Sequence, residues 1–109
     1  MAGVEVFLKQ ILEACEKSEI VGGVKVESFD NVILKVRIYL IEDFFIDVFY
    51  NDDTKRVAFA LVKNEKRVFG ADNTGGWHIH PFDDPERHEP CEPVSFEEFL
   101  EAVERRLKS

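Results

Sequence analysis

Every histidine of the chain lies in one short window, which runs from Asp72 to Cys91. The same window holds the only tryptophan, so its distinctive residues are Trp77, His78, His80 and His88. Imidazole is the side chain whose ordinary pKa lies closest to neutrality, and it is the commonest protein ligand for metals. These histidines are therefore the residues best suited to do chemistry, either by moving protons or by binding a metal ion.

The spacing of the first two histidines predicts how they are arranged. Because His78 and His80 are two residues apart, an extended chain places both imidazoles on the same face of a strand. A reversal over residues 73–77 that pairs Asp72 with His78 would also set Gly70 opposite His80. The carboxylate would then orient an imidazole, and the missing side chain would leave room for a ligand. A slip of one residue in this register would turn the carboxylate away.

Two kinds of chemistry fit this pattern. In the first, the imidazoles act as general base and general acid on a phosphodiester, as metal-independent ribonucleases require, with no cofactor. Basic residues nearby would hold the phosphate, and the tryptophan would either anchor the core or stack on a base. The residues expected to bind substrate are Lys63, Lys66, Arg67 and Trp77.

In the second kind of chemistry, the histidines bind a divalent metal such as zinc. The ligands would be His78, His80 and His88, with Cys91 or Asp72 as a further one, although the sequence has no zinc-finger spacing. The protein would then be a metal-binding or partner-binding structural module without catalytic activity. A third interpretation gives the three histidines no shared task.

The periodicity of apolar residues predicts the elements that position this window. An amphipathic helix is expected from about Val4 to Ser18, and Ser95 with Glu98 forms a capping box that begins a second helix. Alternating residues between them predict strands at 24–29, 32–41, 44–50, 56–63 and 67–72, and a short edge strand at 77–82. Gly22 and Gly23 are expected to precede the first strand.

This order of elements predicts the fold class. Short turns between successive strands favour an antiparallel meander with the N-terminal and C-terminal helices packed on one face. We therefore predict a single α+β domain over residues 1–109, with five to six strands. Its expected core contains Phe7, Ile11, Val36, Ile38, Phe59, Phe99 and Val103. Within this scheme Asp47 alternates with two phenylalanines, either as an exposed strand residue or as a carboxylate that faces the active site.

Composition limits the partners and the compartment. The chain has 109 residues and a net charge of −8, which counts against indiscriminate binding to nucleic acid. Residues 54–70 carry five bases and one acid, whereas residues 83–104 carry nine acids and one base. No signal peptide or membrane span is recognisable, so we expect a cytoplasmic protein. In that compartment Cys15 and Cys91 are expected to be free thiols rather than a disulfide.

Several runs of the sequence also resemble a known family. These runs are FIDVFY from Phe45, AFALVK from Ala58, RVFGADN from Arg67 and WHIHP from Trp77, followed by His88 and an SFEEF helix start. From about Phe44 onward the chain resembles the TumE-like toxins of prokaryotic toxin–antitoxin systems.

The resemblance implies a small cytoplasmic toxin that acts on RNA. It also implies a helix-turn-helix antitoxin as partner. It points to Asp72, His78, His80 and His88 as functional residues, and less directly to Asp47. Apart from the resemblance, a homodimer is a candidate assembly.

Overall fold

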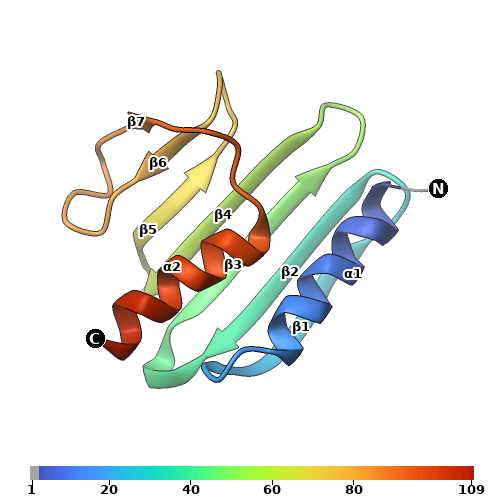
Figure 1. Cartoon of the computed structure of the whole chain (residues 1–109). Coiled ribbons are helices and arrows are strands. Elements are labelled where there is room, and N and C mark those ends of the chain that lie inside the picture. The colour runs from blue at the N-terminus through green and yellow to red at the C-terminus, as the bar shows by residue number, and fades with distance from the viewer. Residues whose placement is uncertain (1–2) are drawn as a thin grey trace.

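The structure is a computed structural model that describes residues 3–109, which form two α-helices and a seven-stranded sheet (Figure 1). The order of elements is α1 (Gly3–Glu16), β1 (Val21–Phe29), β2 (Ile33–Leu40), the short 3-10 helix η1 (Ile41–Asp43), β3 (Phe45–Asn51), β4 (Arg56–Lys63), β5 (Lys66–Asp72), β6 (His78–His80), β7 (Glu89–Pro90) and α2 (Phe96–Lys108).

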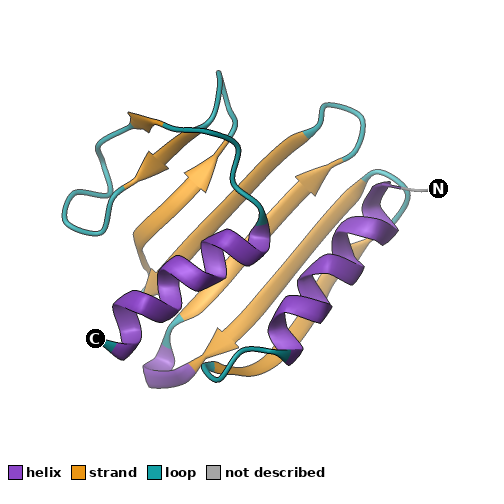
Figure 2. Ribbon diagram, viewed as in Figure 1, coloured by secondary structure: helices purple, strands orange, loops and turns teal. Residues whose placement is uncertain are grey.

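The sheet is a meander in which every strand is antiparallel to its neighbours in sequence. Both helices cover the same face of this sheet, α1 on the side of β1 and β2, and α2 on the side of β3 to β5 (Figures 1 and 2). The predicted α+β class and the position of the helices are confirmed. The sheet has one strand more than expected, because β7 has only two residues and no alternating pattern predicts it.

The core lies between the helices and the sheet. Alternate residues of the central strands point toward the helices, as in β3, where Ile46, Val48 and Tyr50 are buried. Six of the seven predicted core residues are buried, and Phe7 is half-buried with its ring stacked on Tyr50 at 4.4 Å. Across the described part of the chain, residues 3–109, neither helix is long and apolar enough to cross a membrane.

The second helix is fixed at its start by the predicted capping box. The Ser95 side chain accepts a hydrogen bond from the backbone N–H of Glu98, whose carboxylate accepts one from the backbone N–H of Ser95. Near the other end of α2, Glu104 accepts a 2.6 Å hydrogen bond from the hydroxyl of Ser18, just beyond α1. The two helices are thereby joined where the chain enters the sheet.

The first strand begins earlier than the glycines suggested. It starts at Val21, so Gly22 and Gly23 lie inside it, next to an irregularity in the pairing with β2. The two cysteines are free, as expected. Burial raises the pKa of the Cys15 thiol to about 11, which keeps this thiol protonated at neutral pH.

The other face of the sheet has no helix over it, and we call it the helix-free face. Directly paired residues on neighbouring strands point to the same side, so the register defines this face row by row. One row is Arg37, Asp47, Ala60, Gly70 and His80. The next is Lys35, Phe49, Ala58, Asp72 and His78. Asp47, Asp72, His78 and His80 therefore lie on the helix-free face.

Candidate functional site

The turn between β5 and β6 sets the predicted register. Asp72 pairs with His78 and Gly70 pairs with His80, as expected from the sequence. Within the turn the backbone N–H of Gly76 donates to the carbonyl of Asn73 at 3.1 Å. Gly75 and Gly76 have φ angles of 68° and 108°, a region that side chains disfavour and glycine adopts freely. The two glycines therefore make possible a tight turn that aligns the carboxylate with the imidazoles.

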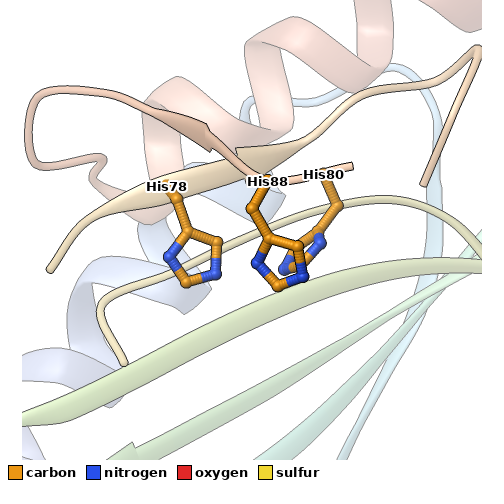
Figure 3. Close-up of side chains that lie close together, drawn as sticks. All are labelled: His78, His80 and His88. Carbon is orange, nitrogen blue, oxygen red and sulfur yellow. The ribbon is translucent and has the colours of Figure 1, made fainter. Parts of the chain in front are cut away.

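The three imidazoles gather at one point (Figure 3). His78 and His80 project from β6, and His88, just before β7, places its ring between theirs in this view. The ring centroids are 4.9 Å apart for His78 and His80, 4.8 Å for His78 and His88, and 4.5 Å for His80 and His88. We call these three side chains the histidine cluster. The loop from Pro81 to Arg87 thus brings a histidine that is distant in sequence back to the other two.

Asp72 holds two members of the histidine cluster with its two carboxylate oxygens. Its Oδ2 lies 3.1 Å from Nε2 of His80 and forms a hydrogen bond, and its Oδ1 lies 3.2 Å from Nε2 of His78. Oδ1 also accepts a 3.0 Å hydrogen bond from the backbone N–H of Thr74. Burial opposes ionisation of this carboxyl, but the Thr74 and His80 hydrogen bonds and the nearby imidazoles outweigh it, so the pKa of Asp72 is lowered.

The ring nitrogens of His78 and His80 have different partners. Both ring nitrogens of His78 face acceptors, Nδ1 the carbonyl of Gly76 at 3.1 Å and Nε2 the carboxylate of Asp72. His80 is only 3% exposed, and its Nδ1 is buried without a partner in residues 3–109. With Nε2–H donated to Asp72, that Nδ1 keeps a free lone pair.

The space next to Gly70 is filled rather than open. A Cβ added there would lie 3.1 Å from Cδ of Arg67 and 3.5 Å from Cδ2 of His80. The expectation that Gly70 leaves room for a ligand is therefore wrong, because the glycine lets Arg67 and His80 approach. The Arg67 guanidinium donates to the carbonyl of Pro85 at 3.1 Å, which anchors the loop that carries His88.

Three other predicted residues lie away from the histidine cluster. Asp47 is on the same face but three strands from His80, about 14 Å at the usual strand spacing. Its carboxylate binds Arg37 through contacts of 2.8 and 3.1 Å. Lys63 donates to the carbonyl of Glu42 and lies over the ring of Phe44. Its strand partner Lys66 lies four residues from Gly70 along β5, about 13 Å away.

Trp77 and Cys91 do not take the substrate-binding and metal-binding places that the two kinds of chemistry would give them. Trp77 is half-buried and packs against the hydrophobic core, which favours the anchoring role over base stacking. Its carbonyl accepts a 3.1 Å hydrogen bond from the backbone N–H of Cys91. The group whose ligand atoms lie within 4.8 Å of one another consists of the histidine cluster alone, so Cys91 is not part of it.

The chain matches no protein-family model, no curated protein and no solved structure. Lys35, Arg37 and Phe49 share the helix-free face with Asp47 and the histidines. Their alternation with the buried residues of β2 and β3 is the signal in the sequence for this placement.

Replacement of Asp72 by asparagine is expected to lower the free energy of unfolding by about 1–3 kcal/mol at neutral pH, because hydrogen bonds to a charged carboxylate are lost. The lowered pKa of Asp72 gives this effect a definite pH dependence. The ionised carboxylate stabilises the fold above its ordinary pKa of 3.8, and this contribution disappears as the pH falls through the lowered native pKa.

Urea denaturation from neutral pH down to about pH 3 measures this difference between Asp72→Asn and the wild type. Asp53→Asn is the matched control, because Asp53 is an exposed turn residue. We expect the Asp72→Asn difference to shrink in acid, while the control stays close to the wild type throughout. A difference that fails to shrink below about pH 4, where the carboxylate loses its charge, would contradict the role of the ionised carboxylate.

Proposed function

We propose that this protein is an RNA-cleaving toxin of a prokaryotic toxin–antitoxin pair, and that the histidine cluster carries out acid–base catalysis without a metal. The observation that supports the chemistry most strongly is the contact of Asp72 with both His78 and His80, which provides oriented imidazoles beside the exposed His88. The resemblance to the TumE-like toxins supports the biological role.

The proposed reaction is an internal attack on the RNA backbone. A neutral imidazole takes the proton from a 2′-hydroxyl, and the oxygen attacks the adjacent phosphorus. A second, protonated imidazole gives its proton to the departing 5′-oxygen, so that a cyclic phosphate and a 5′-hydroxyl are formed. We assign the acid to His78, which lies beside the Asp72 carboxylate, and its N–H must leave one of two acceptors to reach the departing 5′-oxygen. His88 suits the base because it is exposed, while buried His80 holds Asp72 in position.

Arg67 is the cation best placed to stabilise the charged transition state. Its aliphatic chain lies beside Gly70 and His80 on the helix-free face. Arginine forks bind phosphate oxygens more specifically than lysine does, and its guanidinium holds only one backbone carbonyl among the described contacts. Lys63, by contrast, is engaged with Glu42 and Phe44. We therefore assign phosphate binding to Arg67 rather than to Lys63.

The partner and the compartment follow from the same proposal. A toxin that acts on RNA in its host cell works in the cytoplasm and needs an antitoxin, for which the resemblance suggests a helix-turn-helix protein. Inhibition by such a partner requires that it cover the histidine cluster or the approach to it. A homodimer remains a candidate assembly, and sedimentation of the purified chain determines it.

Incubation of the purified protein with RNA tests the proposed function. We expect cleavage products that end in a cyclic phosphate and begin with a 5′-hydroxyl, because the attacking group is the neighbouring 2′-hydroxyl. RNA in which the 2′-hydroxyls are methylated is the control, since it cannot react in this way. Absence of cleavage by the folded protein, or equal cleavage of the methylated RNA, would refute the mechanism.

A second candidate function, binding of zinc, is favoured by one specific observation. The three imidazoles offer ligand atoms within 4.8 Å of one another, and Nδ1 of His80 is a buried nitrogen without a partner. Both nitrogens of His78 already face acceptors, so binding of a metal and donation of a proton would each break one of these contacts. We prefer the acid–base function because the resemblance to the TumE-like toxins points to RNA as the substrate.

A chelator distinguishes the two candidates. We expect RNA cleavage to continue at an unchanged rate in excess EDTA, and the thermal midpoint to be the same with and without added zinc, because no step requires a metal. Elemental analysis of the purified protein provides the control. Stoichiometric zinc, together with unfolding when it is removed, would instead identify the histidines as structural ligands.

A further inference from the structure

The helix-free face carries aromatic rings as well as the histidine cluster. Phe45 and Phe49 lie on the outer side of β3 and are half-buried. Each has a guanidinium nearby: Cζ of Arg37 is 4.0 Å from the ring centre of Phe45, and Cζ of Arg56 is 5.5 Å from that of Phe49. Aromatic rings beside cations on an open sheet are typical of surfaces on which the bases of single-stranded nucleic acids stack.

Small residues lie beside Phe49 on the side of the histidine cluster. Ala58 and Ala60 of β4 form a low floor next to β3, and beyond it β5 carries Asp72 and the Arg67 side chain that covers Gly70. Beside Phe49 this floor contains a depression of about 220 Å³, whose lining includes Lys35, Asp47, Phe49, Ala58 and Ala60. Small-molecule pockets usually measure about 300–1,000 Å³. The depression therefore suits one flat ring of a larger ligand rather than a complete small molecule.

The charge of this face differs from that of the whole chain. Among the strand residues on this face five are bases and three are acids, whereas the whole chain carries −8; the eight are Lys25, Lys35, Arg37, Arg56, Arg67, Glu27, Asp47 and Asp72. The surface of the two helices is acidic by comparison, with Glu97, Glu101 and Glu104 around a depression there. A polyanion is therefore attracted to the helix-free face and repelled from the helices.

From these observations we propose that single-stranded RNA lies across the helix-free face, from the histidine cluster to Phe49, with one base stacked on the Phe49 ring above Ala58 and Ala60. This inference rests on the proposed function, because it takes RNA as the substrate. Phe49, Ala58, Asp72 and His78 are successive partners across four strands, so Phe49 lies about 14 Å from His78. The stacked base therefore belongs to a nucleotide beyond the cleaved phosphodiester.

The arrangement also explains why the ligand is single-stranded. Phe49 lines a depression, and a base can cover its ring only when that base is not stacked and paired within a duplex. Lys35 pairs with Phe49 across β2 and β3 and is exposed, which places a cation beside the proposed base. Lys35 is therefore suited to contact the phosphate next to the nucleotide whose base stacks on Phe49.

The test measures binding of a fluorescent single-stranded RNA with methylated 2′-hydroxyls, which cannot be cleaved, to the full chain. Phe49→Ala is expected to weaken binding about 5- to 100-fold, the usual loss for one stacked base. Lys35→Ala is expected to lower the slope of log affinity against log salt by about 0.7. The matched controls are Phe29→Ala and Lys17→Ala, exposed residues on the helix side that should leave binding unchanged.

The outcomes separate this inference from the proposed function. If Phe49→Ala and Phe29→Ala bind the RNA equally, or a duplex of the same sequence binds as tightly as the single strand, the stacking site is refuted. Cleavage of unmodified RNA by Phe49→Ala with an unchanged KM would also refute it, while the proposed function would stand. Binding that depends on Phe49 in a protein that cleaves no RNA would support the site and refute the reaction.

The alternative occupant of the helix-free face is a second copy of the chain, which would form a dimer through it. Sedimentation of the wild type and Phe49→Ala at the same concentration decides between the two. A single species in both supports RNA as the occupant. A wild-type dimer that Phe49→Ala separates, with unchanged RNA binding, would show instead that the face is a protein interface.

Discussion

Replacement of His88 by alanine is expected to lower the rate of RNA cleavage by about 10²- to 10⁴-fold, the usual contribution of one general acid or base. His88 is exposed, and its ring contacts the other two imidazoles rather than the core. Its removal therefore deletes the chemistry without opening a cavity. Single-turnover cleavage measures the effect, and thermal unfolding monitored by circular dichroism should give an unchanged midpoint.

The matched control is Glu86→Ala, an exposed substitution on the same loop. It should cleave RNA like the wild type. His80 requires a different substitution, because at 3% exposure an alanine would leave a buried cavity. Glutamine keeps much of the volume and can still donate to Asp72, so His80→Gln tests the imidazole rather than the packing.

The pH profile adds an independent check on the reaction. With one imidazole acting as base and another as acid, the wild-type rate should rise and then fall around neutral pH. His88→Ala should lose one limb of this bell. A profile that keeps both limbs, or full activity in His88→Ala, would rule out His88 as a catalytic base.

The largest expected loss of stability follows replacement of Phe99 by alanine, at about 3–5 kcal/mol. Phe99 is 2% exposed, and its ring lies 5.3 Å from that of Phe59 and 5.1 Å from that of Phe69. It therefore joins α2 to β4 and β5. Urea denaturation measures the free energy of unfolding, and Phe29→Ala, which truncates a ring that is 50% exposed, should change it by less than about 0.5 kcal/mol.

Equal losses for the two phenylalanines would contradict this account of the core. The comparison also bears on function, because β5 provides Asp72 and Gly70 to the histidine cluster. If Phe99→Ala remains folded at lower temperature, its residual cleavage rate shows how far the site depends on α2.

The parts of the fold that the sequence predicted are those where a periodic pattern has one solution. In β2 and β3 the strict alternation of apolar residues leaves only one face that can be buried, and Leu34, Val36, Ile46 and Val48 are buried accordingly. The pairing of Asp72 with His78 was predictable for a related reason, because two glycines allow a tight reversal directly between two short extended segments.

The remainder of the site had no such pattern. The segment that carries His88 contains prolines and acidic residues without periodicity, so its return to β6 depends on tertiary contacts such as the Arg67 bond to Pro85. The orientation of Lys63 was predictable, because Val62 pairs with Arg67 on the helix-free face and the next residue of a strand points to the opposite face. Lys63 is close to Arg67 in the hairpin, but its side chain is on the other side of the sheet.

The strands next to the histidines are short, and this affects the free energy at which the site opens locally. β6 has three residues and β7 has two, and they end the sheet on the side away from α1. Short terminal strands usually open at a smaller free-energy cost than the core. We therefore expect the histidine cluster to come apart while the rest of the sheet stays native, and a ligand that bridges β5 and His88 to stabilise it.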